Sequence, residues 1–166
     1  MKSLFVVLLL LAPALLKAVD DPPSTAALFA LTLNTADGRA FALASLKGQP
    51  LVINFWARWC LPCRREIPDL TAVHAEYQGR GLVVVGIAVE EEGKRDGVRD
   101  FARAYDLNYL SLIGGLETSV HLMQALGNGK SGLPFSVVID RRGTIRSSKL
   151  GAMSRPEMRA AIEAVL

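Results

Sequence analysis

An apolar segment that runs straight into a cysteine pair constrains the fold of this chain more than any other feature. Leu51 to Trp56 are apolar except for one residue, which is typical of a central strand buried on both faces. The segment Trp59-Cys60-Leu61-Pro62-Cys63 follows closely, and its two cysteines are the only ones in the chain. From Pro62 onward apolar residues recur every three or four positions, as in a helix. The sequence therefore predicts a thiol pair where a buried strand ends and a helix begins.

This position of the two cysteines predicts dithiol/disulfide exchange. Cys60 falls just before or at the helix start, where unpaired backbone N–H groups and the helix dipole favour a thiolate. Such surroundings lower the pKa of a thiol from about 8.5 towards about 7, so Cys60 is the expected nucleophile. Cys63, one turn inside the helix, is expected to resolve the mixed disulfide that Cys60 forms.

Two other uses of the pair stay open at the level of sequence. A permanent bridge enclosing two residues constrains the unfolded chain little, so stability is a poor reason to have it. A CxxC pair is also half of a zinc site and suits Cu(I), but the sequence has no second half. Three methionines could add thioether ligands for copper, although methionine more often fills cores: Met123, Met153 and Met158.

Residues 1–18 have the pattern of an export signal. Lys2 gives a positive start, Leu4 to Leu16 are mainly apolar, and Leu16-Lys17-Ala18 is a candidate cleavage site. The apolar stretch spans about 13 residues, fewer than the roughly 20 that a membrane-spanning helix needs. We expect a signal peptide at 1–18, a polar linker at 19–27 and a periplasmic location. An uncleaved membrane anchor is the alternative.

The remainder of the chain has the size and charge of one globular domain. Removal of residues 1–18 takes away two lysines and no acid, so the formal net charge falls from +3 to about +1. The basic residues form no stripe of the kind that binds nucleic acid, and no nucleic-acid partner is expected. Residues 28–166 are numerous enough to bury a core without cross-links, so we expect a single domain there.

Alternating strand and helix patterns predict an α/β fold for this domain. Two alternating segments around a turn at 34–38 predict a β-hairpin at 28–43. The order β-α-β-α-β-(α)-β-β-α follows, at 51–56, 62–77, 82–89, 98–105, 107–113, 116–126, 135–140, 144–150 and 155–166. Strands linked by helices pair in parallel, and the late hairpin forms an antiparallel edge. We expect a mixed sheet with helices on both faces.

The motifs resemble those of the thioredoxin superfamily, and within it the TlpA/ResA-like exported thiol-disulfide oxidoreductases. The resemblance rests on Phe55-Trp-Ala-Arg-Trp-Cys-Leu-Pro-Cys-Arg-Arg-Glu-Ile-Pro68, on Gly132-Leu133-Pro134 and on Asp140-Arg-Arg-Gly143. It runs from about Leu28 to the C-terminus. It implies a thioredoxin-like three-layer α/β fold, with a mixed sheet flanked by helices and an added N-terminal β-hairpin.

The resemblance also implies roles for residues near the dithiol. Pro134 falls where the family has a cis-proline facing the dithiol, and Leu133 before it would offer backbone groups to an extended segment of the substrate. Trp59 is expected to shield the thiols, and Trp56 to belong to the core. Pro68 matches the proline that kinks the first long helix, because an interior proline removes a helical hydrogen bond.

The proton acceptor of the resolving thiol is the least certain part of the predicted site. Asn54 stands where plain thioredoxin has a buried aspartate, so that acceptor is missing. In ResA-like proteins a glutamate after the next strand approaches the site, and Glu90 aligns best with it. The resemblance implies that Glu90 takes the proton of Cys63. The alternative is a solvated acidic loop formed by Glu90, Glu91 and Glu92.

The resemblance implies an exported enzyme that reduces disulfides in client proteins. Leu61-Pro62 between the thiols has no ionisable group, and strong oxidants of this motif type often carry a histidine there, so the spacer favours a reductant. The family's clients include apocytochrome c and copper-site proteins of cytochrome oxidase, which connects it with cytochrome c biogenesis. A membrane thiol transporter of the DsbD/CcdA type supplies its electrons. No cofactor and no metal are expected.

Other functions remain as alternatives. One is a thiol oxidase or isomerase, and another is a protein that handles Cu(I) or haem without turnover. A peroxiredoxin is not favoured, because the Pro-x-x-x-Thr-x-x-Cys arrangement of those peroxidases is missing before Cys60.

Overall fold

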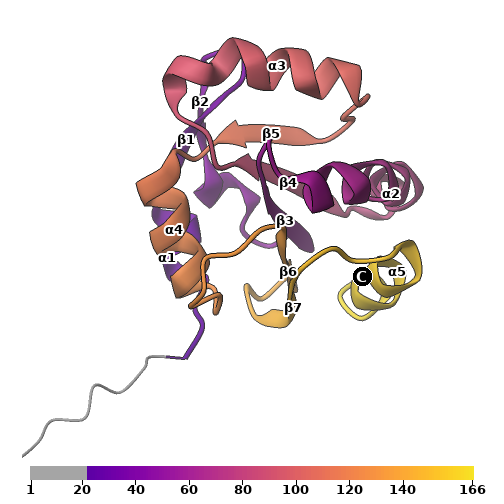
Figure 1. Ribbon diagram of the computed structural model, residues 1–166. Helices are drawn as coiled ribbons and strands as arrows, with labels where there is room; N and C mark the ends of the chain where they lie inside the picture. Colours follow the sequence, from indigo (N-terminus) through magenta and orange to yellow (C-terminus); the bar gives the residue numbers. More distant parts are fainter. Residues whose placement is uncertain (1–21) are drawn as a thin grey trace, which may run out of the picture.

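A seven-stranded mixed sheet forms the centre of the protein. The structure is a computed structural model, and it describes residues 22–166. The strand order is β2-β1-β5-β4-β3-β6-β7 (Figure 1). The strands are β1 (Thr32–Thr35), β2 (Ala40–Ala42), β3 (Leu51–Trp56), β4 (Val83–Ala88), β5 (Leu110–Ile113), β6 (Phe135–Ile139) and β7 (Ile145–Leu150).

The strand directions follow from the connections. β3, β4 and β5 are parallel, because α2 (Leu61–Tyr77) joins the first two and α3 (Arg95–Ala104) joins the last two. β6 pairs antiparallel with β3 and with β7, and the β1–β2 hairpin adds an antiparallel edge to β5. The remaining elements are α1 (Ala26–Ala30), α4 (Leu116–Ala125), α5 (Arg155–Glu163) and the short 3-10 helices η1 (Leu43–Leu46), η2 (Gln78–Arg80) and η3 (Glu92–Lys94). The predicted mixed α/β fold is confirmed.

Alternate side chains of the central strands enter opposite layers. Leu51, Ile53 and Phe55 of β3 belong to a core shared with α1 and α4. Val52 packs with α2 and α5, and Trp56 packs with α2 and α3. Successive side chains of a strand point to opposite faces, so a strand covered on both sides reads as an unbroken apolar run. Figure 1 shows α1 and α4 on one side of the sheet and α2 and α5 on the other, which gives the predicted three layers.

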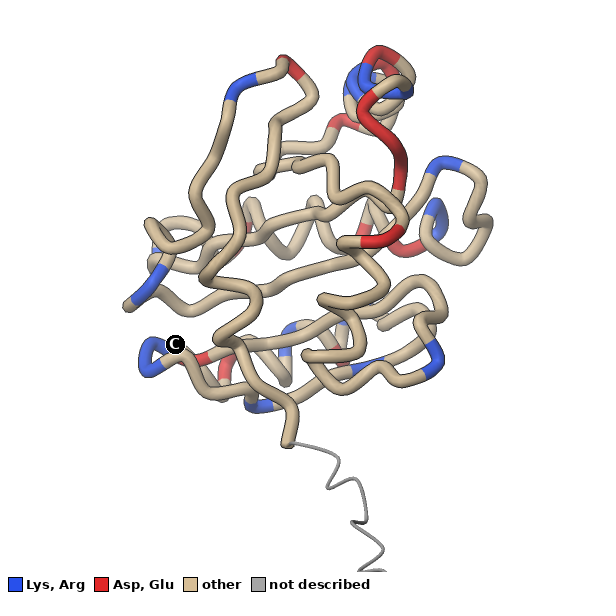
Figure 2. Tube along the Cα trace, turned by 90° about the vertical axis from the view of Figure 1, so that its left-hand side faces the viewer, with Lys and Arg blue, Asp and Glu red and all other residues tan. Residues whose placement is uncertain are grey.

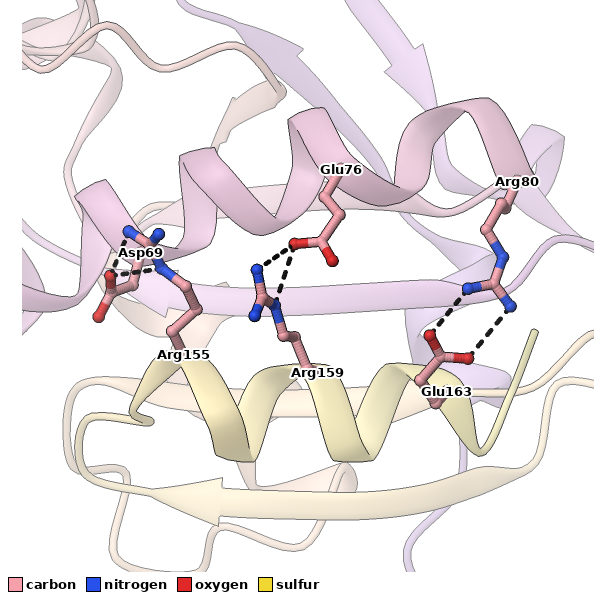
Figure 3. Close-up of polar contacts among 6 residues, drawn as sticks. All are labelled: Asp69, Glu76, Arg80, Arg155, Arg159 and Glu163. Carbon is pink, nitrogen blue, oxygen red and sulfur yellow. Dashed lines mark hydrogen bonds and ion pairs between the residues drawn. The ribbon is translucent and has the colours of Figure 1, made fainter.

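Three ion pairs join α5 to α2 and η2, and they stand in a row (Figure 3). Their shortest N···O distances are 2.8 Å for Arg155–Asp69, 2.7 Å for Arg159–Glu76 and 2.8 Å for Arg80–Glu163. Exposed pairs add little to stability individually, and the apolar contact beneath them comes from Met158 and Ile162. The apolar contact of Met158 and Ile162, with the three ion pairs around it, positions α5 against α2. The loop that begins at Gly151 leads into this helix.

Charged residues lie around the sheet and not within its central part. Strands β3 to β6 contain no charged residue, and Figure 2 shows the acidic and basic positions on the helices and turns that surround them. Any charged side chain that reaches these four strands must therefore come from a flanking helix, a loop or an outer strand such as β7, which carries Arg146 and Lys149.

The N-terminal part of the domain differs from the prediction. Helix α1 occupies the place where the sequence predicted the end of the linker and the start of the first strand, and β1 begins only at Thr32. Residues 26–30, Ala-Ala-Leu-Phe-Ala, are mostly strong helix formers, and Leu28 is fully buried. The hairpin is confirmed at 32–42, but the prediction that its first strand starts at Leu28 was wrong.

The chain before α1 is also attached to the domain. The backbone N–H of Ser24 donates to the carbonyl of Ala125 over 2.9 Å, so the end of the linker predicted at 19–27 follows the domain surface. The signal peptide predicted at 1–18 lies outside the described residues. Between residues 22 and 166 no helix is both long enough and apolar enough to cross a membrane.

Candidate active site

The two cysteines lie at the junction of β3 and α2 and are joined to each other. Cys60 is the N-cap of α2, and its sulfur accepts a hydrogen bond of 3.2 Å from the backbone N–H of Cys63. The two residues form a disulfide with an S–S distance of 2.02 Å. Both residues are buried, but Cys60 is 5% exposed and lines a surface groove, whereas Cys63 is 1% exposed and does not. This agrees with Cys60 as nucleophile and Cys63 as resolving thiol.

The local sequence explains why the pair stands there. β3 is fully buried and ends at Trp56, and the backbone N–H of Cys60 donates to Ala57 O, which closes a tight turn. Pro62 lies in the first turn of α2, where its missing N–H costs no helical hydrogen bond. Pro68 lies inside the same helix, as the resemblance implied. The cysteines are thus held by a rigid strand on one side and a helix on the other.

An apolar groove of about 480 Å³ lies against Cys60. Trp59 and Leu61 stand on its rim and are 69% and 53% exposed, which is unusual for such large apolar side chains. Leu133 lies in its wall, and the Leu133–Pro134 peptide bond is cis. The other lining residues are mostly apolar: Pro62, Val89, Leu116, Val120, Met123, Ser131 and Gly132. Trp59, Cys60 and Leu133, predicted separately from the sequence, therefore meet in one groove.

Trp56 lies in the core, as predicted. Its side chain is fully buried and stacks on Phe101 of α3, with 4.9 Å between ring centroids.

Glu66 is a buried carboxylate that the sequence reasoning missed. It is 3% exposed and lies one helical turn after Cys63, on the same buried face of α2. Its oxygens accept hydrogen bonds from Asn54 Nδ2 over 3.2 Å and from the backbone N–H of Met153 over 2.9 Å. Asn54 also donates to Ser136 Oγ over 2.9 Å. Side chains three positions apart in a helix have Cβ atoms about 5–6 Å apart, so Glu66 neighbours Cys63.

The electrostatics of Glu66 fit proton exchange. Burial raises the pKa of Glu66 above its ordinary value, and the hydrogen bonds from Met153 and Asn54 offset part of that rise. A carboxylate with a raised pKa binds a proton more readily than an exposed one. The signal for this was present in the sequence: position 66 has the helical spacing of Cys63, Ile67 and Leu70, so an acidic residue there had to face the interior.

Glu90, the acceptor predicted from the sequence, is buried but already paired. It is 7% exposed, in contrast to the exposed Glu91 and Glu92 beside it. Its carboxylate accepts hydrogen bonds from the backbone N–H, Nε and Nη2 of Arg58, over 3.1, 3.0 and 3.1 Å. Both oxygens are engaged, and the pair connects the end of β4 to the turn that precedes Cys60. The predicted solvated loop is therefore limited to Glu91 and Glu92.

A comparison with protein families decides the membership of the chain. The model of the AhpC/TSA family matches residues 24–148, which include the dithiol, the groove and both glutamates. The chain belongs to the AhpC/TSA family. Its domain is thioredoxin-like, as the motifs around Cys60 and Pro134 indicated.

Several named proteins are similar to this chain. The chain is 32% identical over 129 residues to the thioredoxin-like protein YneN of Bacillus subtilis (strain 168), covering 76% of this chain and 71% of the relative. It is 28% identical over 133 residues to the thiol-disulfide oxidoreductase ResA of Geobacillus thermodenitrificans (strain NG80-2), covering 80% and 72%. A crystal structure of a thiol:disulfide interchange protein from Chlorobium tepidum TLS superposes with a TM-score of 0.69 at 32% identity, covering 81% of this chain and 92% of that one.

The site of this AhpC/TSA family member is that of a thiol-disulfide oxidoreductase. Its CxxC pair forms a disulfide at a helix start, and its relatives include enzymes of that class. Within residues 22–166 no three His, Cys, Asp or Glu side chains lie close enough together to hold a metal ion. Cys60 lines the apolar groove, and Glu66 follows Cys63 on the buried face of α2.

Proposed function

We propose that the protein reduces disulfides in client proteins by dithiol/disulfide exchange. The observation that carries this proposal is the arrangement of Cys60, Cys63 and Glu66: an accessible sulfur at a helix N-terminus, a buried second sulfur, and a buried carboxylate one turn further on. Each of these is suited to one step of the exchange, and the steps can be written with all atoms accounted for.

In the first step the reduced enzyme attacks the client. The Cys60 thiolate attacks one sulfur of the client disulfide, a Cys60–client bond forms, and the client S–S bond breaks. The departing client thiolate takes a proton from solvent. The apolar groove beside Cys60 supports binding of an extended client segment with apolar side chains next to its cysteine, and Leu133 before the cis-proline lies where its backbone can pair with that segment.

In the second step Cys63 releases the client. The Cys63 thiol gives its proton to the Glu66 carboxylate, and its sulfur attacks Cys60 Sγ. The Cys60–Cys63 bond forms, the Cys60–client bond breaks, and the second client sulfur leaves and is protonated by solvent. Two electrons have passed from the enzyme to the client. Glu66 suits the acceptor role better than Glu90, because both Glu90 oxygens bind Arg58, whereas each Glu66 oxygen accepts a single hydrogen bond.

The surroundings of Cys60 support the reducing direction. Strong oxidants of this motif type hold the thiolate by several favourable interactions, and a lower thiol pKa makes the disulfide more oxidising. In the described part of the chain, the Cys60 sulfur accepts one hydrogen bond, from the backbone of Cys63. Leu61 and Pro62 add no charge. Helix-terminal stabilisation without a cationic side chain favours a reductant.

The proposed compartment is the periplasm, reached through the signal at residues 1–18. A reducing dithiol in an oxidising compartment needs an electron supply, because each turnover leaves the enzyme oxidised. We propose a membrane thiol transporter of the DsbD/CcdA type as donor. Apocytochrome c and copper-site proteins of cytochrome oxidase are the proposed clients.

Trapping of the mixed disulfide tests the proposal. Cys63→Ser removes the resolving thiol, so Cys60 should remain joined to client proteins as complexes that disappear on reduction. Cys60→Ser is the matched control and should give none. If Cys63→Ser traps no protein in periplasmic extracts that contain disulfide-bonded proteins, client reduction is excluded.

The reduction potential separates a reductase from an oxidase or isomerase. We expect a value near that of thioredoxin, about −270 mV. A value near −120 mV, that of a strong oxidant, would assign the reverse direction.

A further inference from the structure

Each of the four central strands has one position without an apolar side chain, and these positions are aligned. They are Asn54 in β3, Gly86 in β4, Ser111 in β5 and Ser136 in β6. Asn54 lies opposite both Ser136 and Gly86, and Gly86 lies opposite Ser111. Residues in register on neighbouring strands share a face of the sheet. The four form a line across the sheet beneath α2, which we call the polar row.

Three polar atoms at the row are buried without a protein partner: Trp56 Nε1, Tyr109 Oη and Ser111 Oγ. Gly86 explains how two of these side chains meet, because a Cβ at that position would stand 2.8 Å from Trp56 Nε1 and 3.0 Å from Tyr109 Cε2. Trp56 is fully buried and Tyr109 is 8% exposed. Buried polar groups are normally satisfied by protein or by ordered water. Several such groups in one place therefore favour bound water.

Asn54 joins the row to Glu66, because its Nδ2 donates to a Glu66 oxygen over 3.2 Å. Burial raises the pKa of the Tyr109 hydroxyl, and the negative charge of Glu66 raises it further. Each Glu66 oxygen accepts one hydrogen bond from the protein, and a carboxylate oxygen can accept two. Glu66 thus has free acceptor positions beside a group of unpartnered donors.

At the β5 end the row reaches a hollow of about 640 Å³, lined by both Tyr109 and Ser111. The hollow lies between α3, β5 and the turn of the β1–β2 hairpin, and it shares no lining residue with the groove beside Cys60. Its charged lining residues are Asp37, Arg39, Arg99, Arg103 and Asp106. Two residues at the β5 end of the row therefore also line a hollow that is separate from the groove beside Cys60.

We propose that the polar row is a water-filled proton path that connects Glu66 to this hollow. The inference rests on the proposed function, in which Glu66 holds a proton after Cys63 has attacked Cys60. The client covers the groove at that moment, so a separate exit is useful. The Glu66 O–H bond breaks, a water molecule in the row takes the proton, and Tyr109 Oη and Ser111 Oγ pass it to solvent. The carboxylate is restored and no electron moves.

Trp56 is a positioning residue in this path. Its indole N–H points at the row and donates to the same water, which orients that water towards Glu66. The other tryptophan, Trp59, is exposed at the rim of the groove and serves as an internal reference.

Hydrogen exchange measured by NMR on the oxidised protein tests for water in the row. Amides of the central strands exchange only through large openings of the fold. We expect the Trp56 indole N–H to exchange about 100-fold faster than the backbone N–H of Ile53, since water already reaches it. An indole that exchanges as slowly as Ile53 would overturn the proposal.

Two substitutions test the route. Ser111→Val replaces the hydroxyl and one Cβ hydrogen by two methyl groups, and Tyr109→Phe removes only Oη. Each should slow exchange of the Trp56 indole by about tenfold and leave Trp59 unchanged. Tyr77→Phe is the matched control, because it makes the same chemical change at the far end of α2, and it should have no effect. If neither Ser111→Val nor Tyr109→Phe changes Trp56 exchange, the path does not run through them.

The catalytic consequence is measured in a single turnover with Cys60 charged with a chromophoric aromatic thiol of low pKa. Such a thiol leaves as a thiolate and stays one, so the proton lost by Cys63 is the net proton released. Release of that thiol reports resolution by Cys63, and a pH indicator in weak buffer reports the proton. We expect the two signals to coincide in the wild type and the proton to lag about tenfold in Ser111→Val. Failure of thiol release in the wild type would refute the proposed function. If thiol release and proton release coincide in Ser111→Val as they do in the wild type, the path alone is refuted.

Discussion

Glu66→Gln is the substitution that most directly tests the chemistry of this site. The side chain keeps its size, and its new amide oxygen can still accept from the backbone N–H of Met153. Asn54 can reverse its own amide, so that its oxygen accepts from the new NH₂ group and from the Ser136 hydroxyl. The substitution therefore removes the proton acceptor while leaving the local packing in place.

The expected loss of rate follows from the ionisation of the resolving thiol. A thiol with an ordinary pKa of about 8.5 is about 3% ionised at pH 7. Without a base, resolution depends on that fraction, so its rate should fall about 30-fold, and further because Cys63 is 1% exposed. Between pH 7 and pH 8.5 the ionised fraction of such a thiol rises from about 3% to about 50%, so the rate of the variant should rise about 16-fold and approach that of the wild type.

The assay is stopped-flow release of a chromophoric thiol from Cys60, with alkylation of Cys60 in the reduced protein as a second readout that Glu66→Gln should leave unchanged. Glu76→Gln is the matched control, because Glu76 is an exposed glutamate on the same helix. A Glu66→Gln variant that resolves within about threefold of the wild-type rate at pH 7 would refute the assignment of Glu66 as general base.

Glu66→Gln should also change the pH dependence of stability. Because the folded protein raises the pKa of Glu66, the fold binds this proton more tightly than the unfolded chain does. Its contribution is present below the ordinary glutamate pKa and is lost as the pH rises through the raised value. The variant should therefore lose less stability than the wild type between acid and neutral pH in chemical denaturation.

Three further predictions concern the surroundings of the site. Glu90→Ala should lower the free energy of unfolding by about 2 kcal/mol, because Arg58 loses three hydrogen bonds to a buried carboxylate. Glu90→Gln should leave the pH profile of resolution by Cys63 unchanged, and a shifted profile would assign the acceptor role to Glu90. Leu116→Glu, at an exposed position lining the groove, should raise KM about tenfold for a disulfide peptide with apolar flanks and leave the rate with oxidised glutathione unchanged; equal effects on both would contradict the groove's role. Glu157→Gln should reduce the pH dependence of stability in acid, because hydrogen bonds from Lys149 and Ser154 lower the pKa of Glu157 to about 2. The stabilisation by these bonds is present above the ordinary glutamate pKa and is lost as the pH falls through about 2. Unfolding followed by circular dichroism at different pH values would measure it.

The fold could be predicted where local pattern and long-range packing agree. β3 and α2 are strong examples, because a short apolar run interrupted only by Asn54 indicates a buried strand and a 3.6-residue period indicates a helix. The N-terminal hairpin was predicted less well. Leu28 fits a loose alternation as well as it fits a helix, and the burial that decides between them comes from α4, far away in the sequence.

The reactive pair could be predicted from sequence, and its proton chemistry could not. Glu90 lies in an acidic loop, and only the structure reveals that Arg58 holds it inside the protein. The polar row could not be predicted from the sequence of any one strand, since Gly86 or Ser111 alone is an ordinary interruption of an apolar run. Its meaning depends on the pairing register of four strands, and register is set by the whole sheet.

Asn54 stands where plain thioredoxin has a buried aspartate, and the contact with Glu66 gives a physical reason for an amide at this position. Asn54 Nδ2 lies 3.2 Å from one Glu66 oxygen, so an aspartate at position 54 would place two carboxylates side by side in a buried space. Two such groups cannot both be ionised, and one would hold a proton permanently near neutral pH. With an amide there, one carboxylate is left to exchange protons, and the same amide anchors it. The acid lies on α2, one helical turn after Cys63, so one helix positions both the resolving thiol and its proposed proton acceptor, and the backbone N–H of Met153 in the loop before α5 binds the carboxylate.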